Sequence, residues 1–317
     1  MQIVADRGAD LSQAVIDQYN INIAPLYINL DGQTYSSGVD IDSKTFYQKL
    51  GQTDAMPTTS MPSPGDFAQL FDSLAQDDPD IFYIHISSGL SGTSKAAQQS
   101  LELVKNANVE MVDSKTLSSP YGWQVEAAAK ALNNGWSIPD IKIYLQSIRL
   151  FSNGMFTLND LKYLIHGGRI SHLKGFLATA LQLKPVIVVD KATGKYIDAG
   201  KGRTIKGAIK QIASALAKFY GEGAKLRIQL LQGDFNEGVE MLKDVIDQHF
   251  ETIYEETLHI APVLGAHTGP SMVGLCAGPW ELFANPTKGT TTEELLEKFK
   301  LPGFSLSLLR DSNKPIL

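Results

Sequence analysis

The chain has 317 residues, of which 43% are hydrophobic and 20% charged, with a formal net charge of −6 and a pI near 5.5. This length predicts two domains, and the composition indicates a globular chain rather than a disordered one. The acidic balance, without a basic stripe carrying interleaved aromatic residues, argues against nucleic acid as a partner.

The sequence lacks the features of membrane and secreted proteins, which indicates its cellular compartment. No stretch reaches the ~20 apolar residues that a membrane-spanning helix needs, so no transmembrane segment is predicted. The first residues lack the basic flank and apolar core of a signal peptide. The single cysteine, Cys276, excludes an intramolecular disulfide and lies among apolar neighbours. We therefore expect a cytoplasmic protein in which Cys276 is a buried structural thiol.

The first half of the chain alternates predicted strands and helices. In chain order the patterns predict a strand at 2–5, a helix at 12–19, a strand at 23–30, a hairpin turn at 31–32, a helix at 43–50 capped by Ser43, a proline-rich loop at 56–65, a helix at 66–76, a strand at 81–86, a helix from about 92, a strand at 109–112, and helices at 121–133 and 139–151. Such alternation predicts a parallel sheet with helices on both faces. Ligands bind beyond the carboxyl ends of these strands, so the loops at 6–10, 87–93 and 113–120 are candidates.

The second half has a different pattern. It predicts helices at 159–165 and 173–183, a β-pair at 185–190 and 195–198, a helix at 205–220, a strand at 226–231, a helix at 236–249, a strand at 251–260 and a short helix at 293–299. The fold class is therefore α/β with two domains, the second a smaller α+β unit with a mixed or antiparallel sheet. We place a Rossmann-like domain at 1–155 with a β-hairpin insertion near 24–40, the α+β domain at 156–280, and a C-terminal extension at 281–317.

Four polar clusters are candidates for binding chemistry. The turn at 87–93 joins an apolar strand to a helix start, where glycines and unpaired N–H groups suit a carboxylate or phosphate. The others are the hydroxyls at 58–60, Arg169 after two glycines, and His267 in a glycine turn after an apolar strand. Taken singly, each is better explained as an ordinary turn, a cap or a solvated side chain.

Some catalytic and cofactor motifs are absent or incomplete. No Walker A motif, complete dinucleotide fingerprint or metal-ligand spacing is present, so neither metal nor cofactor is predicted. Residues 89–93 approach the G-x-S-x-G pattern of serine hydrolases, but Thr93 replaces the last glycine. Ser91, Asp234 and His267 do stand in the chain order of such an enzyme. A serine hydrolase using Ser91 and His267 therefore stays open as an alternative.

Seven segments together resemble the DegV family of bacterial fatty-acid-binding proteins. They occur in the family's order across about residues 1–280, and they read IAPLYINLDGQTY, PTTSMPS, HISSGLSGTSKAA, VDSKTLSSPYG, LKYLIHGGRIS, LKPVIVV and PVLGAHTGP. The resemblance implies two domains with a fatty acid in a tunnel between them. Several such proteins resemble the binding subunit of a two-component fatty acid kinase, which presents the acyl carboxylate to a separate ATP-binding subunit. A lipid-sensing module without a kinase partner is a further alternative.

The resemblance also implies roles for individual residues. Thr59, with Ser60 beside it, and Ser91 match hydroxyls that bind the carboxylate; Gly92 supplies a backbone donor and His267 lies close to the head group. Arg169 and Arg203 match basic positions linked to the kinase partner or the phosphorylated product. The chain departs from the family at Asp6-Arg7-Gly8, where Asp-Ser-Thr is usual, and in its longer tail.

The hydrocarbon of such a ligand would need an apolar tunnel. The candidate wall residues are those at 23–28 together with Phe156, Leu158, Leu161, Leu164, Ile165, Phe176, Leu177, Leu181 and Val263.

Overall fold

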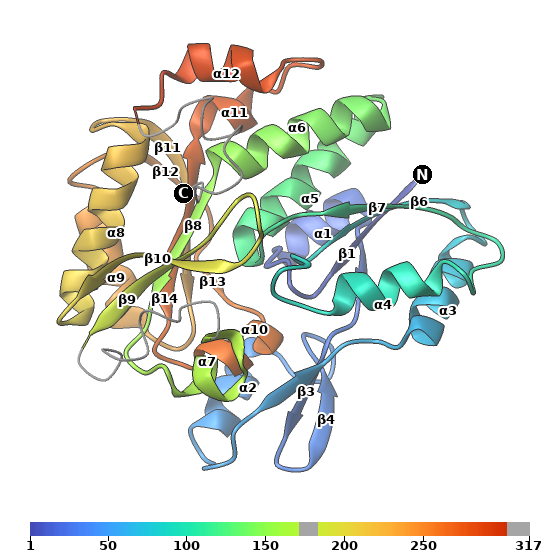
Figure 1. The fold of residues 1–317 in the computed structure, drawn as a ribbon, viewed down its shortest axis with the longest axis horizontal. Helices are drawn as coiled ribbons and strands as arrows, with labels where there is room; N and C mark the ends of the chain where they lie inside the picture. Colours follow the sequence, from blue (N-terminus) through green and yellow to red (C-terminus); the bar gives the residue numbers. More distant parts are fainter. Residues whose placement is uncertain (171–182, 303–317) are drawn as a thin grey trace.

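The computed structural model describes residues 1–170 and 183–302, which form two main sheets, a small third sheet and the helices around them (Figure 1). The first main sheet is entirely parallel, in the order β2-β1-β6-β7. Its strands are β1 Gln2–Asp6, β2 Asn22–Ala24, β6 Asp80–His85 and β7 Asn108–Asp113. The order reverses between β1 and β6, so the loops after these two strands meet at the edge where ligands bind in such sheets.

Helices cover both faces of this sheet. Val4 and Tyr83 pack with Phe67 and Phe71 on one face, whereas Ile3 and its alternate neighbours belong to the main core on the other. Both faces are thus buried, which explains the continuous apolar strands. The helices are α3 Pro64–Leu74 and α4 Thr93–Ser100 on the first face, and α1 Gln13–Tyr19 and α5 Ser118–Asn133 on the second. The predicted α/β class is confirmed.

The second main sheet is mixed and, in the described residues, has seven strands. Its order is β10-β9-β8-β14-β11-β12, and β13 also pairs with β11. Its strands are β8 Asn153–Thr157, β9 Lys184–Val189, β10 Tyr196–Gly202, β11 Lys225–Gln232, β12 Glu251–Tyr254, β13 Leu258–His259 and β14 Val273–Pro279. Two helices, α8 Ile205–Tyr220 and α9 Asn236–Ile246, pack against it.

The two sheets share a helical layer. α5 contacts β1 of the first sheet and β8 and β14 of the second, and α6, Ile138–Phe151, packs against both α5 and β14 (Figure 1). The expected domain boundary at 155 lies within β8, whose strand partners β9 and β14 both belong to the second sheet. The chain therefore enters the second sheet directly from α6.

The region predicted as one strand at 23–30 forms two. β2 ends at Ala24, and after Pro25 the chain enters β3, Tyr27–Leu30, in a small antiparallel sheet of order β4-β3-β5. The predicted hairpin turn is confirmed, with Asp31 at φ 51° and Gly32 at φ 75° leading into β4, Gln33–Ser36. The loop prediction at 56–65 was wrong at β5, Thr58–Ser60. An edge strand needs partners on one side only, and the prolines flank this one.

Several boundaries also differ from the prediction. Asp42, rather than Ser43, caps α2, Ser43–Leu50, by accepting a hydrogen bond from Thr45 N at 2.6 Å. The predicted strand at 251–260 is broken into β12 and β13, and β8 and β14 were not predicted. α7, Lys162–His166, is shorter than expected, and the helix predicted at 173–183 lies almost wholly outside the described residues. Cys276 is buried in β14, as predicted.

The C-terminal extension packs on α5 and α6. It contains α11, Trp280–Ala284, and α12, Thr292–Phe299, which confirms the predicted helix at 293–299. Phe283 stacks edge-on against Trp123 of α5, and Phe299 against Phe151 of α6. None of the helices in the described ranges is long and apolar enough to cross a membrane.

Candidate functional site

A cavity of about 300 Å³ lies where the loop after β6 meets β5 and the helix α10, Pro262–Thr268. All five residues predicted to bind a carboxylate, Thr59, Ser60, Ser91, Gly92 and His267, line it. Its other lining residues are Leu26, Met61, Ile86, Leu90, Thr93, Leu117, Arg169, Tyr196, Val263 and Leu264. The clusters that the sequence placed far apart therefore converge on one space.

Arg169 and Arg203, which the sequence grouped together, are separated in the structure. Arg169 lines the cavity and donates a hydrogen bond to Gly167 O. Arg203 is exposed just before α8 and is not among the residues that line the cavity. One of the two basic positions thus faces the site, and the other faces solvent.

Thr59 reaches the cavity from the edge strand β5. Its strand position opposite Ile28 of β3 holds the side chain half-buried. Its Oγ1 lies 2.9 Å from Nε2 of His267. A hydroxyl both donates and accepts, so Thr59 can serve the imidazole and a ligand oxygen together.

Ser91 lies in the turn between β6 and α4. The turn is closed by hydrogen bonds from Leu90 N and Ser91 N to Ser87 O, both at 3.1 Å. Ser91 Oγ is 2.8 Å from Thr93 Oγ1 and accepts from Thr93 N at 3.2 Å. α4 begins at Thr93, directly after Gly92, so the first N–H groups of that helix lie beside the serine hydroxyl.

His267 lies in the last turn of α10, and the predicted glycine turn was wrong here. Burial, together with the nearby charges of Arg169 and His166, lowers the pKa of His267 from 6.5 to about 3. The imidazole is therefore neutral near pH 7. A Cβ on Gly167 would lie 2.1 Å from its Nδ1, so only glycine lets α7 approach the ring this closely. This contact explains the first glycine of the His-Gly-Gly-Arg segment.

Residues from the N-terminal half hold α10 in place, and the sequence analysis missed them. Asp10 Oδ1 accepts a hydrogen bond from Ala261 N at 2.7 Å, and Ser37 Oγ accepts one from Val263 N at 3.2 Å. Burial raises the pKa of Asp10 from 3.8 to about 6, although its bonds with Ser118 and Ala261 oppose the shift. No short-range pattern in the sequence links residues more than 200 positions apart.

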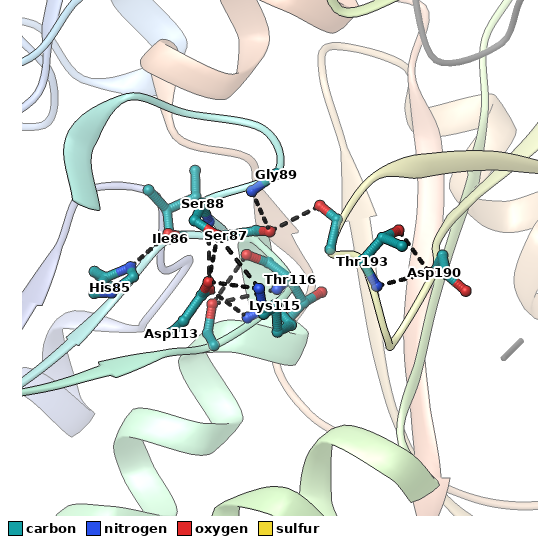
Figure 2. A network of polar contacts seen from close by, with 12 residues as sticks. His85, Ile86, Ser87, Ser88, Gly89, Asp113, Lys115, Thr116, Asp190 and Thr193 are labelled. Carbon is teal, nitrogen blue, oxygen red and sulfur yellow. Dashed lines mark hydrogen bonds and ion pairs between the residues drawn. The ribbon is translucent and has the colours of Figure 1, made fainter. Parts of the chain in front are cut away.

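The loop after β6 is also bonded to the second sheet (Figure 2). Ser87 Oγ donates to Gly194 O at 2.7 Å and accepts from Gly89 N at 3.1 Å. Gly194 belongs to the β9–β10 turn, in which Asp190 accepts from both N and Oγ1 of Thr193. The turn that carries Ser91 is thus fixed relative to both sheets.

A second cavity, of about 40 Å³, shares Leu117, Tyr196 and Leu264 with the first. Its lining is mostly apolar: Thr116, Leu117, Ser118, Pro120, Gly154, Met155, Phe156, Val189, Tyr196, Leu231, Ile260, Leu264, Thr268, Met272 and Leu275. The polar groups therefore stand at one end of the site and apolar side chains line its continuation.

The predicted tunnel wall is only partly found in these two cavities. Leu26, Phe156 and Val263 line them. Leu158, Leu161 and Leu164 are buried in the core outside both cavities, and Ile165 was wrongly predicted because it is 50% exposed on α7. Phe176, Leu177 and Leu181 lie outside the described residues.

The geometry of a serine hydrolase is not formed in the described part of the chain. Ser91 Oγ is bonded to Thr93, and His267 Nε2 to Thr59. Nδ1 of His267 has no hydrogen-bond partner there, and Asp234 is exposed. A catalytic triad requires the acid on one ring nitrogen and the serine on the other. Nor do residues 1–170 and 183–302 contain a cluster of His, Cys, Asp or Glu that could hold a metal ion.

Two sheets that share a helical layer, with two cavities that have lining residues in common, define a two-domain α/β protein. The chain belongs to the DegV family: the family model described as "Uncharacterised protein, DegV family" matches residues 1–279. The resemblance found in the sequence is thereby confirmed. The match ends at the last residue of β14, so α11 and α12 lie beyond it.

Relatives match over most of their length. A DegV domain-containing protein of Deinococcus radiodurans is 32% identical, covering 88% of this chain and 97% of that protein. One from Clostridium perfringens is 35% identical, covering 86% and 96%. A structure titled as fatty acid binding of a DegV family protein from Thermus thermophilus superposes with a TM-score of 0.78 at 29% identity, covering 88% and 99%. A structure titled DegV, a fatty acid binding protein, from Bacillus subtilis has a TM-score of 0.77 at 27% identity, covering 87% and 98%.

Proposed function

We propose that this protein binds a long-chain fatty acid, with its carboxylate and most of its hydrocarbon in the 300 Å³ cavity and the end of the chain reaching the apolar cavity beyond. Thr59, Ser91, the Gly92 N–H and His267 bind the carboxylate, and Ser60 contributes at the same wall. The single observation that carries the proposal is the shared boundary between a polar and an apolar cavity. The fatty-acid-binding titles of the relatives from Thermus thermophilus and Bacillus subtilis support the same ligand class.

The chemistry of the site suits a carboxylate. Burying an unpaired carboxylate is costly, so several donors must reach it at once. The hydroxyls of Thr59 and Ser91 donate to it, and Arg169 in the same cavity lowers the cost of its charge. Each buried methylene of the acyl chain contributes about 0.8 kcal/mol, part of which ordering and association offset.

The protein itself is proposed to perform no chemistry. It presents the bound carboxylate to a separate ATP-binding kinase subunit in the cytoplasm, which forms the acyl phosphate. Arg169, in the cavity, is placed to neutralise the added phosphate, and the exposed Arg203 is placed to contact the partner. The buried Cys276, alone in the chain, is compatible with a reducing compartment.

Native mass spectrometry of protein purified from bacterial cells tests ligand binding. We expect a mass increment equal to a fatty acid, which solvent extraction removes and added hexadecanoic acid restores. A lipid-free protein that also fails to bind hexadecanoic acid in calorimetry would refute the proposal.

The kinase role needs a separate assay. Loaded protein, ATP and a candidate kinase subunit should yield an acyl phosphate that hydroxylamine traps as a hydroxamate. Arg203→Ala should keep fatty acid affinity and lower this yield. An unchanged yield would remove Arg203 from the docking surface, and binding without any yield would favour the lipid-sensing alternative.

A further inference from the structure

Tyr196 of β10 stands at the boundary between the two cavities of the proposed fatty acid site. It lines both of them, as Leu117 and Leu264 do. Its ring packs edge-on against that of Phe156, with 5.7 Å between the centroids, and its partner in the β-ladder is Val189 of β9. Because Phe156 and Val189 line the apolar cavity too, these contacts fix the tyrosine ring at the boundary.

The hydroxyl of Tyr196 forms no hydrogen bond within the described part of the chain, although the residue is only 3% exposed. It is not among the unpartnered atoms that the protein encloses completely, as the hydroxyl of Tyr47 is, so a group in the cavity can reach it. The hydroxyls of Thr59 and Ser91 in the same cavity already have partners within the chain. The Tyr196 hydroxyl therefore has its hydrogen-bonding capacity free for a ligand.

The state of this hydroxyl depends on what fills the cavity. Burial raises the pKa of Tyr196, against the opposing effect of the Arg169 charge, so the phenol keeps its proton at neutral pH. Water satisfies the hydroxyl when no ligand is bound. A plain hydrocarbon chain displaces that water and offers nothing to bond, which leaves a buried polar group unpaired at a cost.

The order of groups along the site indicates which part of a ligand meets Tyr196. The carboxylate is proposed to lie at Thr59 and Ser91, and the end of the acyl chain in the apolar cavity. Tyr196 lines both cavities, so its hydroxyl lies beside carbons between these two ends. An oxygen on one of those carbons would replace the displaced water.

We propose that Tyr196 is a specificity-determining residue that selects fatty acids with an oxygen substituent, a hydroxyl or a carbonyl, near the middle of the acyl chain. The inference rests on the proposed function, because it takes the carboxylate to lie at Thr59 and Ser91. The phenol O–H donates to the oxygen of the chain. A site that bonds an oxygen of its ligand discriminates against the analogue without it, because its own polar group is then left unpaired.

Calorimetric titration of the delipidated full chain tests this selectivity. The probes are octadecanoic acid and three hydroxyoctadecanoic acids, with the hydroxyl beside the carboxylate, at the middle of the chain or at its far end. Among the three hydroxy acids, the natural chain should bind the mid-chain one most tightly. Tyr196→Phe removes only the hydroxyl, and it should weaken binding of that acid about tenfold while octadecanoic acid binds equally well or more tightly.

Tyr163→Phe is the matched control. Tyr163 of α7 is also buried, at 7% exposure, but it lines neither cavity. The same chemical change there should alter the affinity for none of the four acids. If Tyr196→Phe fails to fold, the ranking of the three hydroxy acids by the natural chain decides: a mid-chain acid that binds no more tightly than the other two overturns the inference.

The outcomes separate this inference from the proposed function. An equal loss of affinity for all four acids in Tyr196→Phe would place the phenol at the carboxylate and overturn the inference. Unchanged affinities in that variant would overturn it too, and both results leave fatty acid binding intact. If none of the four acids binds to the natural chain, the proposed function fails and the inference fails with it.

Discussion

The hydrogen bond between Thr59 Oγ1 and His267 Nε2, at 2.9 Å, joins two residues 208 positions apart. Thr59 belongs to the small sheet of the N-terminal half, and His267 to α10 of the C-terminal half, which packs against α2, α7, β3 and β5. The bond therefore ties together the two halves at the wall of the proposed carboxylate site. Because the imidazole is neutral, its hydrogen bond orients the threonine hydroxyl without adding charge to the cavity.

The first prediction concerns the two hydroxyls. Replacing both, with Thr59→Val and Ser91→Ala, should weaken fatty acid binding about 100-fold or more. A hydrogen bond to a charged group is worth about 1.5–3 kcal/mol, and valine preserves the shape and strand preference of threonine. Calorimetric titration of the delipidated protein with hexadecanoic acid measures the effect.

Ser88→Ala is the matched control for this experiment. Ser88 stands in the same turn as Ser91, but it is exposed and its hydroxyl is bonded to Asp113 (Figure 2). Its loss should leave the affinity unchanged. If the double variant binds as tightly as the Ser88 control, the carboxylate is not held at Thr59 and Ser91.

The second prediction uses the lowered pKa of His267. Unfolded histidine takes up a proton below about pH 6.5, whereas in the folded protein its pKa is about 3. The contribution of the neutral ring to the free energy of unfolding is thus complete above pH 6.5. It is lost as the pH falls toward 3, by at most about 1.4 kcal/mol per pH unit. His267→Gln should therefore lose less stability than the natural chain between about pH 6.5 and pH 5.

Urea unfolding at both pH values measures this difference. A constant offset between the two proteins would mean that the ring is not buried and neutral.

How far the site was predictable depends on the range of the interactions involved. The turn at Ser91 was predicted because an apolar strand, a glycine-serine turn and a helix start are all local patterns. The helix that carries His267 was not predicted, since its Gly-Ala-His-Thr-Gly stretch has turn preferences that packing against α7 overrides. The central strand β14 was missed for a similar reason: it contains two glycines and ends in proline, and its pairing with β8 and β11 stabilises it.

Asp10 shows the limit of sequence reasoning at this site. It was placed correctly in a loop after β1, but its role depends on Ala261, 251 residues away. Its raised pKa arises from burial between these distant segments, which no local pattern encodes. The order of the sequence motifs predicted that the polar residues lie together. The residues that hold them in position could be identified only from the tertiary structure.

The third prediction follows from Asp10 and has the opposite sign to that of His267. The folded pKa of Asp10, about 6, exceeds the unfolded value of 3.8. The stability that the protonated carboxyl contributes is complete below pH 3.8 and is lost as the pH rises through 6. Asp10→Asn cannot ionise, so its stability relative to the natural chain should rise between about pH 4 and pH 7.

The test is how the difference in unfolding free energy between the two proteins changes with pH, rather than its size at one pH. Asparagine also changes the hydrogen bonds to Ala261 and Ser118, which shifts that difference at every pH. Urea unfolding across that range measures the slope. A difference that is flat with pH would show that Asp10 is ionised in the folded protein throughout.

The last prediction concerns Gly194, which touches the loop that carries Ser91. Gly194 has φ of +67°, and a Cβ there would lie 2.1 Å from Ser87 Oγ. Gly135 has φ of +72° and nothing within 4 Å, so Gly135→Ala carries the backbone strain alone. That strain costs about 1 kcal/mol, and Gly194→Ala should lose roughly 1–2 kcal/mol more because the hydrogen bond to Ser87 must break or shift.

The same two variants also test whether the contact between Gly194 and Ser87 affects fatty acid binding. Ser87 O accepts the hydrogen bond of Ser91 N at 3.1 Å, so displacing Ser87 moves the serine that is proposed to hold the carboxylate. Gly194→Ala should therefore weaken fatty acid binding, whereas Gly135→Ala should not, and calorimetry at a temperature where both variants are folded measures the two affinities. Equal affinities would mean that the turn adopts its binding conformation without the second sheet, and that the contact in Figure 2 serves stability alone.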